Sequence, residues 1–100
     1  MGKGNLDVPK GKIAEFCRRN HIRRLSLFGS VLRDDFRPDS DVDVLVEFEP
    51  RTRVGLRFFA MERELSQILG RNVDLNTPGF LDDEILGTAL AEAEVQYDVA

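Results

Sequence analysis

The stretch FGSVLRDDFRPDSDVDVLVEF, residues 28–48, contains the pattern that decides the fold of this 100-residue chain. A Gly–Ser pair, Gly29 and Ser30, ends an apolar run. After ten intervening residues a D-x-D pair, Asp41 and Asp43, opens a second run that is strongly β-type. Successive side chains of a strand point to opposite faces, so both aspartates face the same way. Two like charges held together favour a cation between them, which indicates a metal site at the start of this strand.

An alternative interpretation places residues 39–41 in a polar turn and Asp43 at the surface. It does not explain why Asp43 lies within a run of valines, where an aspartate is disfavoured unless it has a compensating role. Carboxylates suit Mg²⁺, which is usually held by one or two of them plus substrate phosphates. Gly29 would let the backbone approach a ligand closely, and Ser30 offers a hydroxyl and an N–H to a phosphate oxygen.

Asp74 is the candidate for a third carboxylate. It lies in a short predicted strand, residues 72–76, and the alternative is an exposed residue of an edge strand. If this strand lies beside the strand of residues 41–48, Asp74 joins the acidic cluster. Three carboxylates would then hold two Mg²⁺ ions, one activating an attacking hydroxyl and one clamping a triphosphate, with Asp74 nearest the nucleophile. Arg33 either reaches a phosphate or pairs with a nearby acid; the sequence leaves both open.

Composition limits the function further. A net charge of −4 and a charged fraction of 32% predict a soluble, acidic protein. This disfavours direct DNA binding, which depends on neutralising phosphates, and favours a basic protein partner. One cysteine (Cys17) and one histidine (His21) exclude a His/Cys zinc site. The arginines between residues 18 and 24 and between 51 and 57 are interpreted as solvated faces. We find no signal peptide and no membrane span, and we expect a cytoplasmic protein.

Hydrophobic periodicity predicts the α/β (α+β) class: one domain over residues 1–100 with a small three-stranded mixed sheet flanked by about four helices. Residues 1–8 are expected to be a flexible lead. The connection after the first strand is too short for a crossover, so the first two strands should be antiparallel neighbours. The expected elements are a helix from Pro9 to about Asn20, strands over 22–28, 41–48 and 72–76, a short helical turn over 30–35 and a helix over 55–69. A last helix is expected to begin with the acidic residues 82–84 and to bury Ile85, Ala89, Leu90 and Ala93.

The combination of the Gly–Ser pair at 29–30, D-x-D at 41–43 and a later strand aspartate, Asp74, resembles the signature of the DNA polymerase β-type nucleotidyltransferase superfamily. The surrounding sequence, FGSxxR at 28–33 and SDVDVLV at 40–46, more closely resembles the minimal nucleotidyltransferases of prokaryotes, which are often encoded beside a HEPN-domain protein. The resemblance covers roughly residues 10–95 and implies a polymerase β-like nucleotidyltransferase fold.

The resemblance also implies roles for single residues. Asp41, Asp43 and Asp74 would be the catalytic metal ligands, and Gly29 and Ser30 would hold the nucleotide phosphates. Members of this branch act as antitoxins, and some transfer AMP from ATP to a tyrosine of a partner HEPN ribonuclease. We therefore expect a Mg²⁺-dependent nucleotidyltransferase that uses ATP and silences a HEPN toxin. The alternatives are a non-catalytic module that neutralises the toxin by complex formation, and an enzyme whose acceptor is a small hydroxyl compound.

Arg33 matches the family's arginine and is the third candidate for nucleotide binding. Leu32 and Asp34 stand where the family often has a small residue and a glycine, which leaves the role of Arg33 open and adds negative charge near the phosphate path. Exposed apolar residues on the helix faces would serve either a homodimer or a toxin interface. The sequence does not decide between these partners.

Overall fold

The computed structural model describes residues 8–29 and 41–99. The predicted helical turn at 30–35 and all but the last residue of the predicted flexible lead lie outside these ranges. In the described part of the chain no helix is long and apolar enough to cross a membrane. The elements follow in the order α1 (Lys10–Arg19), β1 (Ile22–Phe28), β2 (Val42–Phe48), α2 (Arg57–Leu69), β3 (Val73–Asn76), the 3-10 helix η2 (Pro78–Phe80), α3 (Asp83–Glu92) and β4 (Glu94–Asp98).

The sheet is mixed, as predicted, and its strand order is β3-β2-β1-β4. Strands β1 and β2 are antiparallel neighbours, which confirms the prediction from the short connection. The prediction of three strands is wrong, because Glu94–Asp98 forms a fourth strand that pairs antiparallel with β1. Without β4 the outer edge of β1 would present unpaired backbone groups, and edges of this kind are usually covered.

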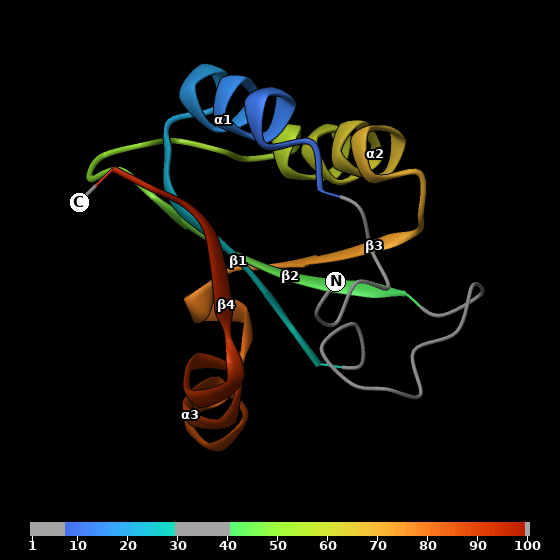
Figure 1. The fold of residues 1–100 in the computed structure, drawn as a ribbon. Helices are drawn as coiled ribbons and strands as arrows, with labels where there is room; N and C mark the ends of the chain where they lie inside the picture. The colour runs from blue at the N-terminus through green and yellow to red at the C-terminus, as the bar shows by residue number, and fades with distance from the viewer. Residues whose placement is uncertain (1–7, 30–40, 100) are drawn as a thin grey trace.

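Two helices, α1 and α2, cover one face of the sheet (Figure 1). Their apolar stripes pack on the alternate apolar residues of β2, so one contiguous core forms between the layers. Burying each of these large apolar side chains contributes about 1.5–3 kcal/mol. In α2 the buried stripe ends on Leu69, and the neighbouring Ile68 is only partly buried. The helical core residues are Ile13, Phe16 and Cys17 of α1 and Phe58, Met61, Leu65 and Leu69 of α2.

The third helix, α3, lies on the opposite side of the sheet from α1 and α2 (Figure 1). It begins within the predicted acidic cluster, where the Asp82 carboxylate caps the helix by accepting a hydrogen bond from the Ile85 N–H at 3.0 Å. The predicted four-residue buried stripe is wrong. Only Ala89 is buried, whereas Ile85 and Leu90 are 51% and 49% exposed. A helix that rests on a sheet through one small residue leaves the larger side chains on its flanks in contact with solvent.

Three arginines of the first basic cluster, Arg19, Arg23 and Arg24, pair with acids on neighbouring elements. Arg23 and Arg24 both form ion pairs with Glu47 on β2, and Arg24 also contacts Asp98 on β4. Arg19 on α1 pairs with Glu64 on α2, and this hydrogen-bonded carboxylate raises the pKa of the arginine. These pairs lie at the surface of the fold, in agreement with the interpretation of the cluster as a solvated face.

Candidate active site

The parallel pairing of β2 with β3 brings two of the predicted site residues together. Asp43 is the ladder partner of Asp74, and the pairs Val42–Val73 and Val44–Leu75 flank them. Neighbouring strands lie about 4.8 Å apart, and paired residues of parallel strands project from the same face. Asp43 is half-buried and Asp74 is exposed. The third predicted strand therefore lies beside the second, which was the condition for Asp74 to join the acidic cluster.

Asp41 precedes β2 by one residue and is exposed. The next residue, Val42, donates its N–H to the carbonyl of Asn72 at 2.8 Å, so the two chains are already paired at this point. Asp41 and Asp74 both line a cavity of about 360 Å³ at the outer edge of β3, to which α2 contributes Arg63. Asp41 therefore lies at the same end of β2 as Asp43, beside the start of β3.

Gly29 lies directly against Asp43. Its φ of +80° belongs to the left-handed region, which residues with a side chain rarely adopt. A Cβ atom at this position would overlap the Oδ2 atom of Asp43. The preceding residue, Phe28, is the ladder partner of Asp43 in the β1–β2 pair, which explains the proximity. Glycine is thus required here both for its backbone conformation and for the space that the carboxylate fills.

Two other predicted nucleotide-binding residues, Ser30 and Arg33, lie outside the described residues. Within the described ranges, no group of three or more His, Cys, Asp or Glu side chains is placed to hold a metal ion. The donor set available to Mg²⁺ is instead the Asp43–Asp74 pair with Asp41 close by. Such a pair fits this ion, because Mg²⁺ is commonly bound through one or two carboxylates and completes its shell with substrate phosphates and water.

Cys17 and His21, whose number excluded a His/Cys zinc site, lie away from the aspartates. Cys17 of α1 is buried in the core, and burial raises the pKa of its thiol to about 12. A thiol with that pKa is protonated at neutral pH and is neither a nucleophile nor a metal ligand. His21 follows α1, where its Nδ1 lies 3.7 Å from a carboxylate oxygen of Glu49. The C-terminal cap of α1 is provided by Asn20, whose side-chain amide donates to the Phe16 carbonyl.

Sequence reasoning missed two residues that support β3. Glu62 and Ser66 lie one turn apart on α2 and accept the N–H groups of Leu75 and Val73, at 2.9 and 3.1 Å. These N–H groups belong to the residues on either side of Asp74. A polar pair spaced by four on one helix face is a detectable signal, but nothing in the sequence indicates that its partners are backbone groups of an edge strand.

Residues 10–95 match the family described as the nucleotidyltransferase domain. The chain is 38% identical over 78 residues to the protein adenylyltransferase MntA of Thermococcus cleftensis, a match that covers 78% of each protein. It is 32% identical to a chain of known structure described as "Structure of putative minimal nucleotidyltransferase", with a TM-score of 0.71 and coverage of 85% of this chain and 86% of the other.

A third similarity concerns the fold alone. The chain superimposes with a TM-score of 0.66 on a structure described as the tri-AMPylated Shewanella oneidensis HEPN toxin in complex with the MNT antitoxin. The sequence identity is 20%, and the match covers 90% of this chain and 70% of the other. At this identity the superposition shows that the two chains share the arrangement of helices and strands.

Proposed function

We propose a specific activity from one established premise: the chain belongs to the nucleotidyltransferase domain family, and within it to the minimal nucleotidyltransferases. The proposed reaction is the transfer of AMP from ATP to a tyrosine hydroxyl of a partner HEPN toxin, which the chain thereby silences as an antitoxin. Two relatives support this proposal. The Thermococcus protein is named a protein adenylyltransferase, and the Shewanella structure contains an AMPylated HEPN toxin with an MNT antitoxin.

The observation that carries the proposal is the register of Asp43 with Asp74, with Gly29 packed against the first of them. Adenylyl transfer needs carboxylates that gather positive charge beside a triphosphate, and it needs a backbone that can approach the phosphates closely. In the proposed site the Asp43–Asp74 pair, with Asp41 close by, would hold Mg²⁺, two ions when the nucleotide is bound. Gly29, Ser30 and Arg33 hold the nucleotide phosphates.

In the proposed reaction the acceptor hydroxyl oxygen attacks the α-phosphorus of ATP. A new oxygen–phosphorus bond forms, and the bond between the α-phosphorus and the oxygen that bridges to the β-phosphorus breaks. Pyrophosphate leaves with the bonding electrons, and the hydroxyl proton must be removed. We assign the removal of this proton to Asp74, which is the exposed member of the ladder pair. Bound Mg²⁺ would neutralise the triphosphate and lower the pKa of the attacking hydroxyl.

The test is label transfer from ATP radiolabelled on the α-phosphate to a purified HEPN-domain protein. We expect D43N to lower the transfer rate about 100-fold or more, the scale on which loss of one transition-state charge stabiliser acts. The matched control is E15Q, which removes a carboxylate from the exposed face of α1. Transfer that persists in the double variant D41N/D43N, with the fold intact by circular dichroism, contradicts the proposed activity.

The same variants separate catalysis from simple complex formation. Cells that produce the HEPN toxin should lose protection when the antitoxin carries D43N. Protection that survives while label transfer is lost would mean that the chain neutralises its partner by binding alone. The net charge of the chain, −4, is compatible with such binding to a basic partner.

A further inference from the structure

Gly29 and Asp74 lie on opposite sides of Asp43 in the sheet. Strand β1 pairs with one edge of β2 and brings Gly29, a proposed phosphate contact, to that side. Strand β3 pairs with the other edge and brings Asp74, to which we assign the removal of the acceptor proton. Under the proposed function, the acceptor therefore reaches the site from the β3 side. The helix on that side is α2, which is hydrogen-bonded to β3 on either side of Asp74.

The outer face of α2 carries the two most exposed large apolar side chains among the described residues. Leu56, at the N-cap of α2, is 84% exposed, and Phe59 is 59% exposed. Arg63 follows Phe59 by four residues, so the three side chains form one row along the helix. Arg63 lies about 6 Å from Phe59 along the helix axis. It also lines the cavity of about 360 Å³ that Asp41 and Asp74 line, so this row leads from the proposed site along α2.

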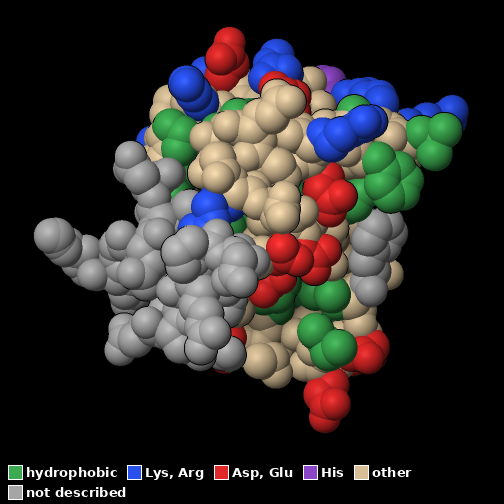
Figure 2. Space-filling view, turned by 90° about the vertical axis from the view of Figure 1, so that its right-hand side faces the viewer, with side chains coloured by type: hydrophobic (Ala, Val, Ile, Leu, Met, Phe, Trp, Pro, Cys, Tyr) green, Lys and Arg blue, Asp and Glu red, His purple; other side chains and the backbone are tan. Residues whose placement is uncertain are grey.

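The arginines near this row are not neutralised within the described part of the chain. Arg53, Arg57 and Arg63 are exposed and form no ion pair with a described residue, in contrast to the three paired arginines of the first basic cluster. Figure 2 shows hydrophobic side chains next to Lys and Arg side chains at the upper right of one face, with acidic side chains below them. Arginine and phenylalanine are enriched at protein interfaces, and positive charge attracts an acidic partner surface.

Two other kinds of partner fit this face poorly. A second copy of the chain, related by a two-fold axis, would place the arginines of each copy opposite those of the other, and like charges oppose such contact. A nucleic acid would meet Asp41, Glu62 and Asp74, which line the adjoining cavity and repel phosphates. An acidic protein surface with exposed apolar side chains would satisfy both the arginines and the apolar pair.

We propose that the row of Leu56, Phe59 and Arg63, with the adjoining Arg53 and Arg57, is the docking surface for the acceptor protein. The docking face of that protein is apolar and carries Asp or Glu. This inference rests on the proposed function and names the surface that holds its protein substrate. The apolar pair would supply most of the affinity, because fully buried anchors dominate interfaces, while the exposed arginines mainly speed association.

A binding experiment tests the docking surface apart from catalysis. The probe is the purified HEPN-domain protein of the transfer assay, and its affinity for the immobilised full chain is measured by biolayer interferometry without ATP. We expect L56A/F59A to weaken binding about tenfold or more, the scale on which interface anchors act. The matched control is I85A/L90A, which truncates two half-exposed apolar side chains of α3, on the opposite side of the sheet (Figure 1). An equal loss of affinity in the control, or no loss in L56A/F59A, overturns the proposal.

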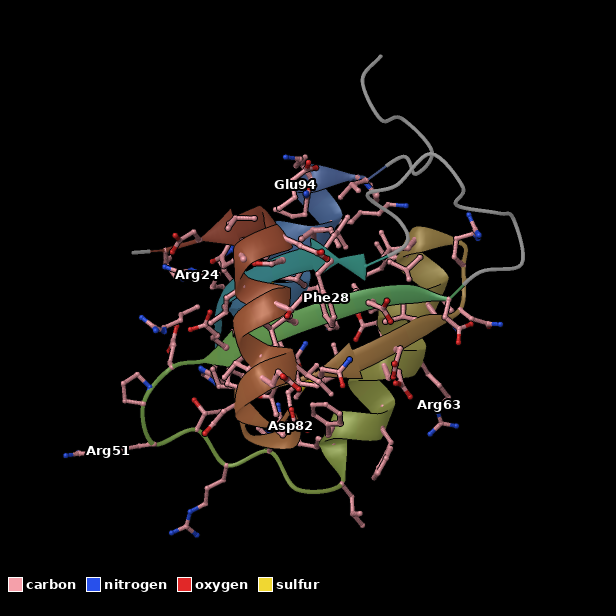
Figure 3. The ribbon with its side chains drawn as sticks, turned by 90° about the horizontal axis from the view of Figure 1, so that it is seen from below. Arg24, Phe28, Arg51, Arg63, Asp82 and Glu94 are labelled. Atoms are coloured by element: carbon pink, nitrogen blue, oxygen red, sulfur yellow. The ribbon has the colours of Figure 1, made fainter. Side chains whose placement is uncertain are left out.

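Charge reversal tests the acidic character of the partner. Figure 3 shows Arg63 extending outward from α2, while Arg51 lies at the opposite end of this view. Both are exposed, and neither pairs with an acid in the described ranges. R63E should slow association about fivefold and make it less sensitive to salt, and R51E should leave the rate unchanged. Faster association of R63E would mean that the docking face of the partner is basic and would overturn the proposal.

The other occupants are tested on the same variants. Sedimentation of the chain alone should be the same for the wild type and L56A/F59A. A wild-type dimer that L56A/F59A dissociates would assign the face to a second copy and overturn the proposal. Binding of a fluorescein-labelled single-stranded RNA that L56A/F59A and R63E abolish would assign the face to nucleic acid and overturn it as well.

Kinetics distinguish failure of the docking surface from failure of the proposed function. In the transfer assay L56A/F59A should raise KM for the HEPN-domain protein and leave kcat and KM for ATP unchanged. An unchanged KM for the acceptor overturns the docking surface and leaves the proposed reaction intact. If the wild type transfers no label but the binding contrasts hold, the proposed reaction fails and the docking surface stands.

Discussion

The side-chain carboxylate of Glu62 on α2 accepts a hydrogen bond from the backbone N–H of Leu75 on β3, at 2.9 Å. One turn later, Ser66 accepts the N–H of Val73 at 3.1 Å. Edge strands present such groups to solvent, where pairing with other chains is a hazard. Here α2 satisfies both of them and holds β3 against β2. The position of Asp74 opposite Asp43 therefore depends on two side chains of a neighbouring helix.

Replacing Glu62 tests this dependence. E62A leaves the Leu75 N–H without its acceptor, which should lower the free energy of unfolding by about 1–2 kcal/mol. It should also slow AMP transfer, because Asp74 is held less firmly. E62Q keeps a side-chain oxygen that accepts the same bond and should restore both properties. Urea denaturation gives the stability, and hydrogen exchange at Leu75 reports the bond itself. Equal exchange rates in E62A and E62Q would contradict this role for Glu62.

Gly29 and Gly70 form a matched pair for a second prediction. Both have a left-handed backbone, with φ of +80° and +70°, but a Cβ would meet the Asp43 carboxylate at Gly29 and nothing within 4 Å at Gly70. G29A and G70A should each lose about 1–2 kcal/mol of stability from the backbone alone. Only G29A should abolish AMP transfer, since it displaces Asp43. Transfer by G29A at the rate of G70A would show that the contact has no part in the activity.

The N-terminus of α3 provides a third prediction. Asp82 caps this helix through the N–H of Ile85, and loss of an N-cap costs about 1 kcal/mol. D82A should therefore reduce stability by that amount. D82N keeps the capping oxygen and should retain most of the stability. Thermal unfolding followed by circular dichroism measures this loss, and equal stability of D82A and D82N would contradict the role of the cap.

Cys17 gives the pH dependence of stability a definite sign. Burial raises the pKa of this thiol from 9.0 to about 12 in the folded chain. Between these values the unfolded chain loses the thiol proton while the folded chain keeps it. The stability from this group is therefore complete below pH 9.0 and is lost as the pH rises toward 12. Denaturation between pH 8 and 11 should show this fall in the wild type and a weaker fall in C17A. Equal slopes in the two proteins would contradict it.

The strands of the fold were predictable because their side chains alternate. The predicted ranges 22–28, 41–48 and 72–76 agree with β1, β2 and β3 to within one residue at each end. The short link between β1 and β2 also determined their antiparallel pairing. The pairing of β2 with β3 could not be predicted from the sequence, where it was only the condition for Asp74 to join the acidic cluster. It depends on how α2 packs across the sheet, through contacts far apart in the chain.

Two errors near the C-terminus have one physical origin. Residues 82–93 have helical periodicity, and the alternation of Glu94–Asp98 is too short to stand out after it, so β4 was missed. The apolar residues Ile85 and Leu90 were assigned to the core because of their chemistry. The structure leaves them half-exposed, and Ile85 lines a cavity between α3 and the end of β1. The contacts of Glu62 and Ser66 were likewise beyond prediction, because their partners are backbone groups.

Above all, we propose that Asp43 and Asp74 act together as ligands of a divalent ion beside ATP. The most direct measurement is the affinity for Mn²⁺, used as a paramagnetic substitute for Mg²⁺, by electron paramagnetic resonance in the presence of ATP. We expect D43N and D74N each to lose protein-dependent Mn²⁺ binding, while E15Q, changed on the far helix α1, binds as the wild type does. Undiminished Mn²⁺ binding in both D43N and D74N would contradict the claim.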